Sequence, residues 1–358
     1  MSLGRLYREI ILDEEMCTRY LKDKGVLPNQ PVTCSKVRED EVCGGELKEC
    51  LRKSKKRDAN GEFIKAVYLR CSKRGCQTFY SLRGTNKFFT YSDVSGKCNS
   101  KLSFCQIVEL VWMWCNLVSN SDCERWTGRG NHTITDWYNM CRDVCVDMYG
   151  KRSKMGGVGL VVQIDESLFQ GKRKYNRGRL LASDRRRHET VPVSDSDSSD
   201  CENEPTNGES SAQNYGQRVQ GPWVFGMCCN KDGVLERRFF VVERRDRATL
   251  LPIILNEIEQ GSSVHSDCWR AYSTLADHGY THHTVNHSEN FVDPTTGAHT
   301  QTIESLWRHV KLKYKIKHCG ATKLLERQLM EEWWRSVNAG KDLLDSFFND
   351  MKTTFLVA

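Results

Sequence analysis

The sequence lacks the long apolar segments that membrane and secreted proteins carry. No stretch approaches the roughly 18 to 20 uncharged apolar residues that a helix needs to span a bilayer. Residues 1–15 mix arginines and acidic residues among their apolar positions, so they lack the core of a signal peptide. We therefore expect a protein that is neither secreted nor a membrane protein, with no membrane among its partners.

The sequence has no internal repeats. It also has no export signal, which would place the cysteines in a compartment that favours disulfide bonds. Its 358 residues contain 17 cysteines, an odd number spread over the whole length. Such a number without an export signal favours reduced thiols and metal ligands over a disulfide framework. Hydrophobic residues make up 39% and charged residues 28% of the chain. This composition and length predict two or three domains with real cores.

Lysine and arginine are absent from residues 189–210, which contain seven acidic groups. The block before it, residues 151–188, contains 11 Lys and Arg against three Asp and Glu, a net charge of +8. A basic block of this kind binds nucleic-acid phosphates by releasing their counterions. A solvated loop explains it about equally well. The low-complexity, acidic stretch 189–220 is predicted to be a disordered insertion.

Hydrophobic periodicity and composition predict a protein of the α/β class with additional modules. The expected parts, in chain order, are a helical lead-in (1–31), a cysteine-rich ribbon (32–95), a helical domain (98–150), a mixed-sheet domain that contains the insertion (156–320), and C-terminal helices (321–358).

Four cysteines of the ribbon have the chemistry of a closed structural zinc site. Cys71 and Cys76 bracket a short basic turn, and Cys34 and Cys43 form a second pair. Four thiolates from two such turns hold one zinc ion, whose binding supplies folding energy that a small ribbon lacks. Cys50 could replace Cys34 as the fourth ligand, and free buried cysteines are the alternative to a metal site.

A run of basic residues lies inside the ribbon. Residues Arg52–Arg57 (RKSKKR) are basic at five of six positions. Such runs contact phosphate or serve as nuclear localisation signals, although a solvated loop is equally compatible with the run. We accordingly expect the protein in the nucleus.

Three helices are expected in the next domain, at Leu102–Val118, Ser121–Trp126 and Thr133–Tyr149. These lengths suit a helix-turn-helix whose third helix enters the major groove. Its first polar residues would then read bases: Asn131, His132, Thr133, Thr135 and Asp136. Thr133 with Asp136 is also predicted to cap this helix. Three packed helices more often form a helical domain that does not bind DNA. The prediction of DNA recognition therefore depends mainly on the neighbouring segments, which indicate the same partner.

Three carboxylates of the α/β domain lie at the ends of predicted elements. Asp165 ends the first strand, Asp267 ends the fourth, and Glu304 lies near the start of a lysine-rich helix. In a mixed sheet of order 3-2-1-4 the first and fourth strands are neighbours, so the two aspartates would lie side by side. Close carboxylates need divalent cations between them, and hard oxygen ligands suit magnesium or manganese. Two such ions about 3.5–4 Å apart catalyse phosphodiester cleavage.

Any one of these carboxylates alone is most simply a solvated end of a strand or helix. Their combination in a β-β-β-α-β-α order favours a catalytic site. Four runs in this domain have distinctive patterns: Val162–Gly171 (VQIDESLFQG), Lys172–Arg179 (KRKYNRGR), Ser266–Tyr272 (SDCWRAY) and Val285–Lys311 (VNHSENFVDPTTGAHTQTIESLWRHVK).

These runs resemble transposases of the Merlin superfamily and their bacterial insertion-sequence relatives of the ISXO2-like type. The 36 residues between Asp267 and Glu304 are the interval that this resemblance expects. The resemblance covers residues 30–320 and implies an RNase-H-like fold in which Asp165, Asp267 and Glu304 hold two magnesium (or manganese) ions. The wide spacing of Cys34 and Cys43, the acidic insertion and the C-terminal helices depart from the family's pattern.

The resemblance implies a DDE transposase, an enzyme that binds double-stranded DNA at the terminal inverted repeats of its transposon. Water would attack the phosphodiester bond at each transposon end, and the exposed 3′-hydroxyl would then attack target DNA. Two ends must be paired, so a homodimer or larger homo-oligomer is expected. The main alternative is a non-cutting DNA-binding regulator derived from a transposase, although it would not need the three carboxylates. A third possibility is a structure-selective nuclease of the same fold.

Further residues are candidates for DNA contact or for support of the carboxylates. Lys311 lies seven residues after Glu304 on the same helical face and could contact the scissile-strand phosphate, whereas Trp307 is expected to pack in the core. His287 and His299 flank the loop before Glu304 and could orient substrate or a carboxylate, although local hydrogen bonding is the simpler role. Five basic residues follow the first catalytic strand, where DNA must pass: Lys172, Arg173, Lys174, Arg177 and Arg179.

Overall fold

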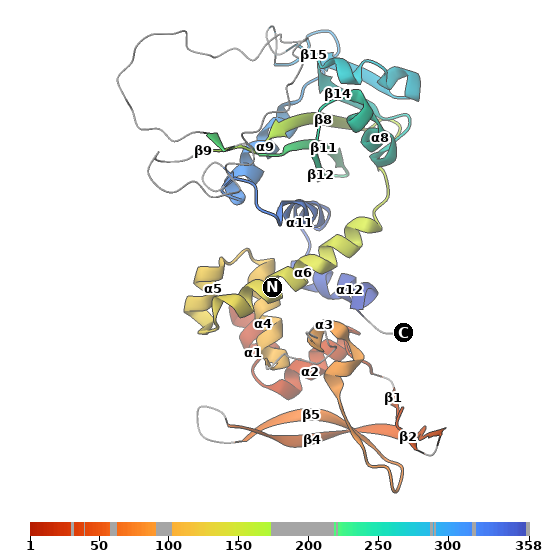
Figure 1. The fold of residues 1–358 in the computed structure, drawn as a ribbon, viewed down its shortest axis with the longest axis vertical. Helices are drawn as coiled ribbons and strands as arrows, with labels where there is room; N and C mark the ends of the chain where they lie inside the picture. Colours follow the sequence, from red (N-terminus) through yellow and green to blue (C-terminus); the bar gives the residue numbers. More distant parts are fainter. Residues whose placement is uncertain are drawn as a thin grey trace. The chain divides into compact units, whose positions relative to one another are not determined.

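The computed structural model describes residues 1–29, 32–38, 40–57, 63–90, 102–172, 218–219, 221–286, 289, 291–316 and 320–355. The chain divides into two units, Met1–Arg152 with Val337–Ala358, and Ser153–Ser336 (Figure 1). Within the described ranges, no helix has the length and apolar character needed to cross a membrane.

The first unit begins with two short helices, α1 (Leu3–Glu9) and α2 (Glu14–Asp23). Each has a side-chain N-cap: the Ser2 hydroxyl accepts from the N–H of Arg5, and the Asp13 carboxylate accepts from the N–H of Met16. Leu21 of α2 is fully buried. These caps satisfy backbone donors that a helix of this length would otherwise leave exposed.

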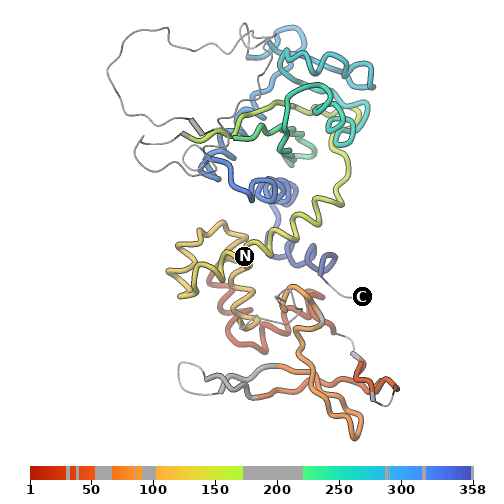
Figure 2. Tube along the Cα trace, in the orientation of Figure 1, coloured from red at the N-terminus to blue at the C-terminus, as the bar shows by residue number. Residues whose placement is uncertain are grey.

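A four-stranded antiparallel sheet follows, in the order β1-β4-β5-β6. Figure 2 traces the coloured parts of β4 and β5 as neighbouring segments of the chain. The elements of this region are β1 (Val32–Thr33), β2 (Val37–Arg38), β3 (Glu41–Val42), β4 (Glu46–Arg57), β5 (Phe63–Cys71), β6 (Phe79–Ser81), the 3-10 helix η1 (Leu82–Thr85) and α3 (Lys87–Thr90).

Three helices continue the unit: α4 (Phe104–Cys115), α5 (Asn120–Thr127) and α6 (Asn131–Gly150). They correspond to the three predicted helices, but the predicted cap of the third is wrong. Helix α6 begins at Asn131 with Gly130 as its N-cap, and no side chain caps it. Thr133 is the third residue inside the helix and has helical backbone angles, whereas an N-cap residue is extended.

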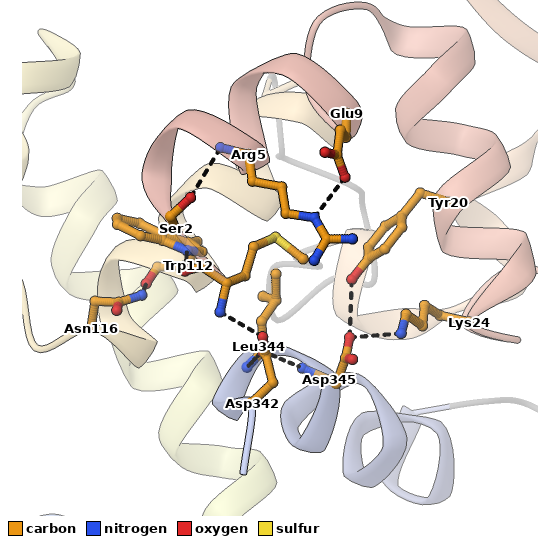
Figure 3. Close-up of polar contacts among 11 residues, drawn as sticks. Ser2, Arg5, Glu9, Tyr20, Lys24, Trp112, Asn116, Asp342, Leu344 and Asp345 are labelled. Carbon is orange, nitrogen blue, oxygen red and sulfur yellow. Dashed lines mark hydrogen bonds and ion pairs between the residues drawn. The ribbon is translucent and has the colours of Figure 1, made fainter. Parts of the chain in front are cut away.

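Helix α12 (Leu343–Phe355) completes the first unit. Phe347 lies 5.7 Å from Phe88 and 5.6 Å from Trp114 between ring centroids. Asp345 accepts a hydrogen bond from Tyr20 at 3.3 Å and pairs with Lys24 at 2.7 Å (Figure 3). The expected C-terminal segment 321–358 is therefore divided, because α11 (Leu325–Val337) lies in the second unit except for its last residue.

The second unit contains a five-stranded mixed sheet in the order β12-β11-β8-β14-β15. The β8, β11 and β12 strands are antiparallel, whereas β14 runs parallel to both β8 and β15. This arrangement confirms the α/β class and the predicted neighbourhood of the first and fourth strands. The strands are β8 (Val161–Leu168), β11 (Trp223–Lys231), β12 (Val234–Val242), β14 (Ser263–Asp267) and β15 (Thr281–Val285).

Helices cover both faces of this sheet. On one face, Val162 and Ile164 join a core with Leu250 and Ile254 of α8 (Arg247–Glu257). On the other, β11 and β12 pack against α9 (Gln301–Lys313) and α11. Since side chains alternate along a strand, the odd-numbered residues of β8 face α9. Smaller elements are β7 (Met155–Gly156), β13 (Ile258–Glu259), η2 (Arg270–Tyr272) and η3 (Leu275–His278).

A short antiparallel pair flanks the predicted insertion. Strand β9 (Gly171–Lys172) pairs with β10 (Arg218–Val219). The predicted boundary at residue 220 is therefore wrong, because the backbone groups of residues 218–219 have strand partners. Residues 189–217 and residue 220 of the predicted insertion lie outside the described residues.

Candidate functional site

Asp165 and Asp267 lie on neighbouring parallel strands. In the β8–β14 ladder, His265 is opposite Gln163, an offset of 102 residues. The same offset (267 − 165 = 102) places Asp267 next to Asp165, two residues beyond the last ladder pair. Both aspartates project from the α9 side of the sheet, since residues two apart on a strand share a face.

The three predicted carboxylates lie in one electrostatic neighbourhood. Burial raises the pKa of Asp165 to about 6; a hydrogen bond from Trp307 opposes the rise, and the charges of Asp267 and Glu304 add to it. Nearby like charges raise a carboxyl pKa in this way because they disfavour its ionised form. A divalent cation would offset this repulsion, so the donor set fits magnesium or manganese.

The carboxylates are more widely spaced than the ligands of a single-ion site. Among the described residues, only four cysteines form a group of three or more His, Cys, Asp or Glu with ligand atoms all within 4.8 Å of one another. Asp165, Asp267 and Glu304 do not form such a group. A site for two cations would not require such close spacing, because the three carboxylates would be shared between the two ions.

Trp307 contacts the first aspartate directly. Its indole Nε1 donates to Oδ2 of Asp165 at 2.8 Å. The ring also packs in the core, with its centroid 5.0 Å from that of Phe239 and 6.0 Å from that of Phe169. The sequence predicted that Trp307 packs in the core but did not predict its hydrogen bond to Asp165. The spacing of residues along a helix does not show which strand the helix packs against.

Gln163 connects β8 to the first turn of α9. Its Oε1 accepts from the backbone N–H groups of Thr302 and Ile303 at 3.1 and 3.2 Å, and its Nε2 donates to Nδ1 of His299 at 3.2 Å. The first N–H groups of a helix have no partner within it, so an acceptor from the sheet holds this helix end in place.

Thr300, the N-cap residue of α9, makes no side-chain cap of its own. Its hydroxyl instead donates to Oε1 of Glu304 at 2.9 Å. Gln163 therefore supplies the cap that Thr300 does not, and it sets the position of the turn that carries Glu304. Sequence reasoning missed Gln163, although it lies two residues before Asp165 and on the same face of the strand.

Glu166 is a fourth acidic residue of this neighbourhood that sequence reasoning also missed. Its Oε1 is buried and has no hydrogen-bond partner among the described residues. Burial raises its pKa to about 8, and the charges of Asp267 and Asp165 contribute in the same direction. A buried polar atom without a partner costs free energy, which points to a functional role or to a cation nearby. The adjacent Asp-Glu pair was its only signal in the sequence.

Two of the other residues predicted near the three carboxylates, Lys311 and His299, lie within the part of the chain that the structure describes. The Lys311 ammonium donates to Oγ of Ser167 at 2.6 Å and lies 5.5 Å from the ring centroid of Phe169. The backbone N–H of His299 donates to Nδ1 of His265 at 3.4 Å. Arg173, Lys174, Arg177, Arg179, His287 and the side chain of Lys172 lie outside the described residues.

The four predicted zinc ligands form the second candidate site. The Sγ atoms of Cys34, Cys43, Cys71 and Cys76 all lie within 4.8 Å of one another. Cys34 and Cys76 are 3.7 Å apart, as are Cys43 and Cys71. Tetrahedral zinc with Zn–S bonds of about 2.3 Å would hold thiolates about 3.8 Å apart. The thiols therefore fit one zinc ion.

The surroundings of the thiols also suit a metal site. Hydrogen bonds from Thr78 lower the pKa of Cys76, and one with Tyr80 lowers the pKa of Cys34. A Cβ on Gly45 would lie 2.7 Å from Sγ of Cys71, so only glycine lets the backbone pass this close to the cluster. Cys50, the predicted alternative, is not in the cluster. It pairs with Tyr68 on the opposite face of β4 from Leu47, the partner of Cys71.

The predicted base-reading residues lie at the start of α6. Asn131 and His132 are exposed, and Thr133 is half-buried. Thr135 holds α5 to α6, since its Oγ1 donates to Oδ1 of Asn131 at 3.0 Å and accepts from Nδ2 of Asn120 at 2.9 Å. The three-residue turn 128–130 that joins the two helices has the length found in helix-turn-helix units.

The family match found for this chain lies within the second unit. Residues 201–336 match the family described as the ISXO2-like transposase domain, a range that includes Asp267 and Glu304 but not Asp165. A transposase-like protein of Haemophilus influenzae is 33% identical over 100 residues, which are 28% of this chain and 79% of that protein. The crystal structure of the Mos1 strand transfer complex aligns with 69% of this chain and 74% of its own, at 9% identity and a TM-score of 0.24. That score is too low to establish a shared fold.

Proposed function

This chain belongs to the ISXO2-like transposase family, and we propose that it is a DDE transposase that cleaves transposon ends and joins their 3′ ends to target DNA. The observation that carries the proposal is the position of Asp165 beside Asp267 on parallel strands, in electrostatic contact with Glu304 of α9. Membership of the Merlin superfamily is a further part of the proposal, supported by the four sequence runs around these residues.

In this proposal Asp165, Asp267 and Glu304 would hold two magnesium or manganese ions. When bound, the ions would activate the attacking oxygen and stabilise the leaving oxygen of the phosphodiester. The chain's own contribution is the alignment of the carboxylates. Trp307 orients Asp165 through its indole N–H, and Gln163 orients the helix turn that carries Glu304.

The DNA partner would be double-stranded, at terminal inverted repeats and at the target. The proposed phosphate contacts are the basic run Lys172–Arg179 and Lys311, and the proposed base contacts are the exposed Asn131 and His132 of α6. A homo-oligomer would pair the two transposon ends. One zinc ion on the four thiols would stabilise the ribbon, since a small ribbon draws its folding energy from the metal. The nuclear location suggested by Arg52–Arg57 stays a prediction.

Cleavage of the protein's own genomic surroundings tests this function. A DNA fragment that spans the coding region with long flanks would be incubated with purified protein and magnesium, and every new DNA end would be mapped by sequencing. We expect paired cuts at inverted repeats with wild type and none with Asp267→Asn. Asp232→Asn, an exposed change in the β11–β12 turn of the same unit, is the matched control and should cut normally.

Footprints from both wild type and Asp267→Asn without any cut would contradict the catalytic proposal. That result would favour the non-cutting DNA-binding regulator. Cuts that follow DNA shape, without joining of the 3′ ends to a target, would favour a structure-selective nuclease instead.

A further inference from the structure

Among the described residues, the two faces of the ribbon sheet differ in exposure. Leu47, Leu69 and Cys71 are buried on one face, and Glu49 on that face pairs with Lys22 of α2. The alternation of side chains directs the intervening residues to the opposite face. We call this opposite surface the arginine–aromatic face, and it consists of Lys48, Arg52, Tyr68, Arg70 and Phe79.

Strand register brings these five residues together. Lys48 is opposite Arg70, and Arg70 is opposite Phe79 on the next strand, so these three form a row across the sheet. Cys50 is opposite Tyr68 in the neighbouring row, and Arg52 follows two residues further along β4. Phe79 is 42% exposed, which is a large value for a phenylalanine side chain on a sheet.

The two arginines lie over the aromatic rings of this face. The Arg52 guanidinium carbon is 5.0 Å from the ring centroid of Phe79 and 5.9 Å from that of Tyr68. The Arg70 guanidinium carbon is 5.5 Å from Phe79, and its Nη2 donates to Oε1 of Gln77 at 2.7 Å. A guanidinium that lies over a ring keeps its N–H edges available, and these edges match the oxygens of a phosphate.

The charges of the face complement a polyanion. Lys48, Arg52 and Arg70 supply three positive charges, against one carboxylate at the end of the strand, Glu46, which lies 3.7 Å from Lys48. In the sequence, Lys53–Arg57 follow directly after Arg52, and four of these five residues are basic. Lysine and arginine on a surface of one sign bind the nucleic-acid backbone through counterion release.

We propose that the arginine–aromatic face binds the phosphate backbone of double-stranded DNA. This inference rests on the proposed function only in taking DNA as the partner; the surface lies in the ribbon, outside the carboxylate triad and the start of α6. The guanidinium groups cover the rings, so a base from a single strand would have to displace them before it could stack. Phosphates can reach the N–H edges of the guanidinium groups without such a rearrangement.

The test compares two double variants of the full-length, zinc-loaded protein. Arg52→Gln with Arg70→Gln removes both guanidinium groups of the face. Arg5→Gln with Arg19→Gln removes the same charge from two exposed arginines of α1 and α2, each of which pairs with a glutamate in its own helix. Zinc content and circular dichroism of both variants should match those of wild type, because all four side chains are exposed.

Binding is measured by fluorescence anisotropy of a labelled duplex of mixed sequence over a series of salt concentrations. Each lost phosphate contact lowers the slope of log K against log salt by about 0.9. We expect the Arg52/Arg70 variant to bind at least about tenfold more weakly at low salt, with a slope smaller by about 2. The Arg5/Arg19 variant should keep the wild-type slope.

Three results would overturn the proposal in distinguishable ways. An Arg52/Arg70 variant with the affinity and slope of wild type would remove the face from the DNA-binding surface and leave the proposed function intact. Weaker binding only to a single-stranded oligonucleotide of the same sequence would replace backbone contact with base stacking. A wild-type protein that binds no duplex at any salt concentration would remove DNA as the partner, and both proposals would fail.

Discussion

Gly226 leaves the space that the indole ring of Trp307 occupies beside Asp165. Gly226 is directly opposite Asp165 in the β8–β11 ladder. A Cβ at this glycine would lie 2.5 Å from the Trp307 ring and 3.1 Å from the ring of Phe239. The hydrogen bond from Trp307 to Asp165 thus depends on the absence of a side chain on the neighbouring strand.

Gly226→Ala is expected to destabilise the second unit by about 1–3 kcal/mol, because the added methyl group overpacks the core at the indole ring. It should also reduce DNA cleavage, since Trp307 must move away from Asp165. Urea unfolding and the cleavage assay measure the two effects. Gly150→Ala, at a position where a Cβ would meet no atom within 4 Å, is the control. Equal stability and cleavage in both variants would contradict the role of Gly226.

Gln163→Ala is expected to weaken magnesium binding and cleavage, because two N–H groups at the start of α9 lose their acceptor, at a cost of about 1–3 kcal/mol. Gln163→Glu should restore both, since a carboxylate accepts the same bonds and suits a helix N-terminus. Magnesium titration by calorimetry beside the cleavage assay separates this role from a general loss of folding. Gln260→Ala, at an exposed position of the same unit, is the control. If Gln163→Glu does not recover activity, Gln163 does not act by positioning the first turn of α9.

Cys34→Ser and Cys50→Ser should differ in zinc content. Cys34 belongs to the four-thiol cluster, whereas Cys50 lies on the opposite face of β4. We expect one zinc ion per chain in wild type and Cys50→Ser, and a loss of zinc with a lower unfolding midpoint in Cys34→Ser. Elemental analysis after dialysis against buffer without zinc makes the comparison. Equal zinc content in the two variants would exclude this ligand set.

Glu166 should make the stability of the magnesium-free protein depend on pH. Its pKa in the folded protein is raised from 4.5 to about 8, so the folded state binds this proton more tightly than the unfolded state does. Stability should therefore fall as pH rises from about 4.5 to 8. Glu166→Gln should flatten this dependence and be more stable than wild type at pH 8, by on the order of 1 kcal/mol or more.

Urea unfolding at several pH values in magnesium-free buffer measures this dependence. Glu259→Gln, an exposed change in the same unit, should leave the profile of wild type unchanged. If the profiles of wild type and Glu166→Gln coincide over the whole range, the buried carboxylate does not control stability.

The sequence by itself predicted the two strands and the helix of the second unit that hold the three carboxylates. Asp267 ends its strand and Glu304 lies in the first turn of its helix, as predicted, whereas β8 continues beyond Asp165 to Leu168, so the predicted end of this strand is wrong. The β-branched run Gly159–Ser167 (GLVVQIDES) is a local property of the chain, so it marks a strand without knowledge of its neighbours. The chain order of these strands and helices then predicted that the first and fourth strands pair, as the sheet shows. Four cysteines in two pairs likewise indicated a cluster, although the sequence left Cys34 and Cys50 as alternatives.

Only the tertiary structure decided which side chains support the carboxylates. Gln163 caps a helix that begins 138 residues later (301 − 163 = 138), and Gly226 matters because of a tryptophan on that same helix. Such contacts depend on how closely a strand and a helix approach, which neither hydrophobic periodicity nor residue spacing encodes. The choice of Cys34 over Cys50 was decided in the same way, because strand pairing places Cys50 on the face of β4 opposite to the four-thiol cluster.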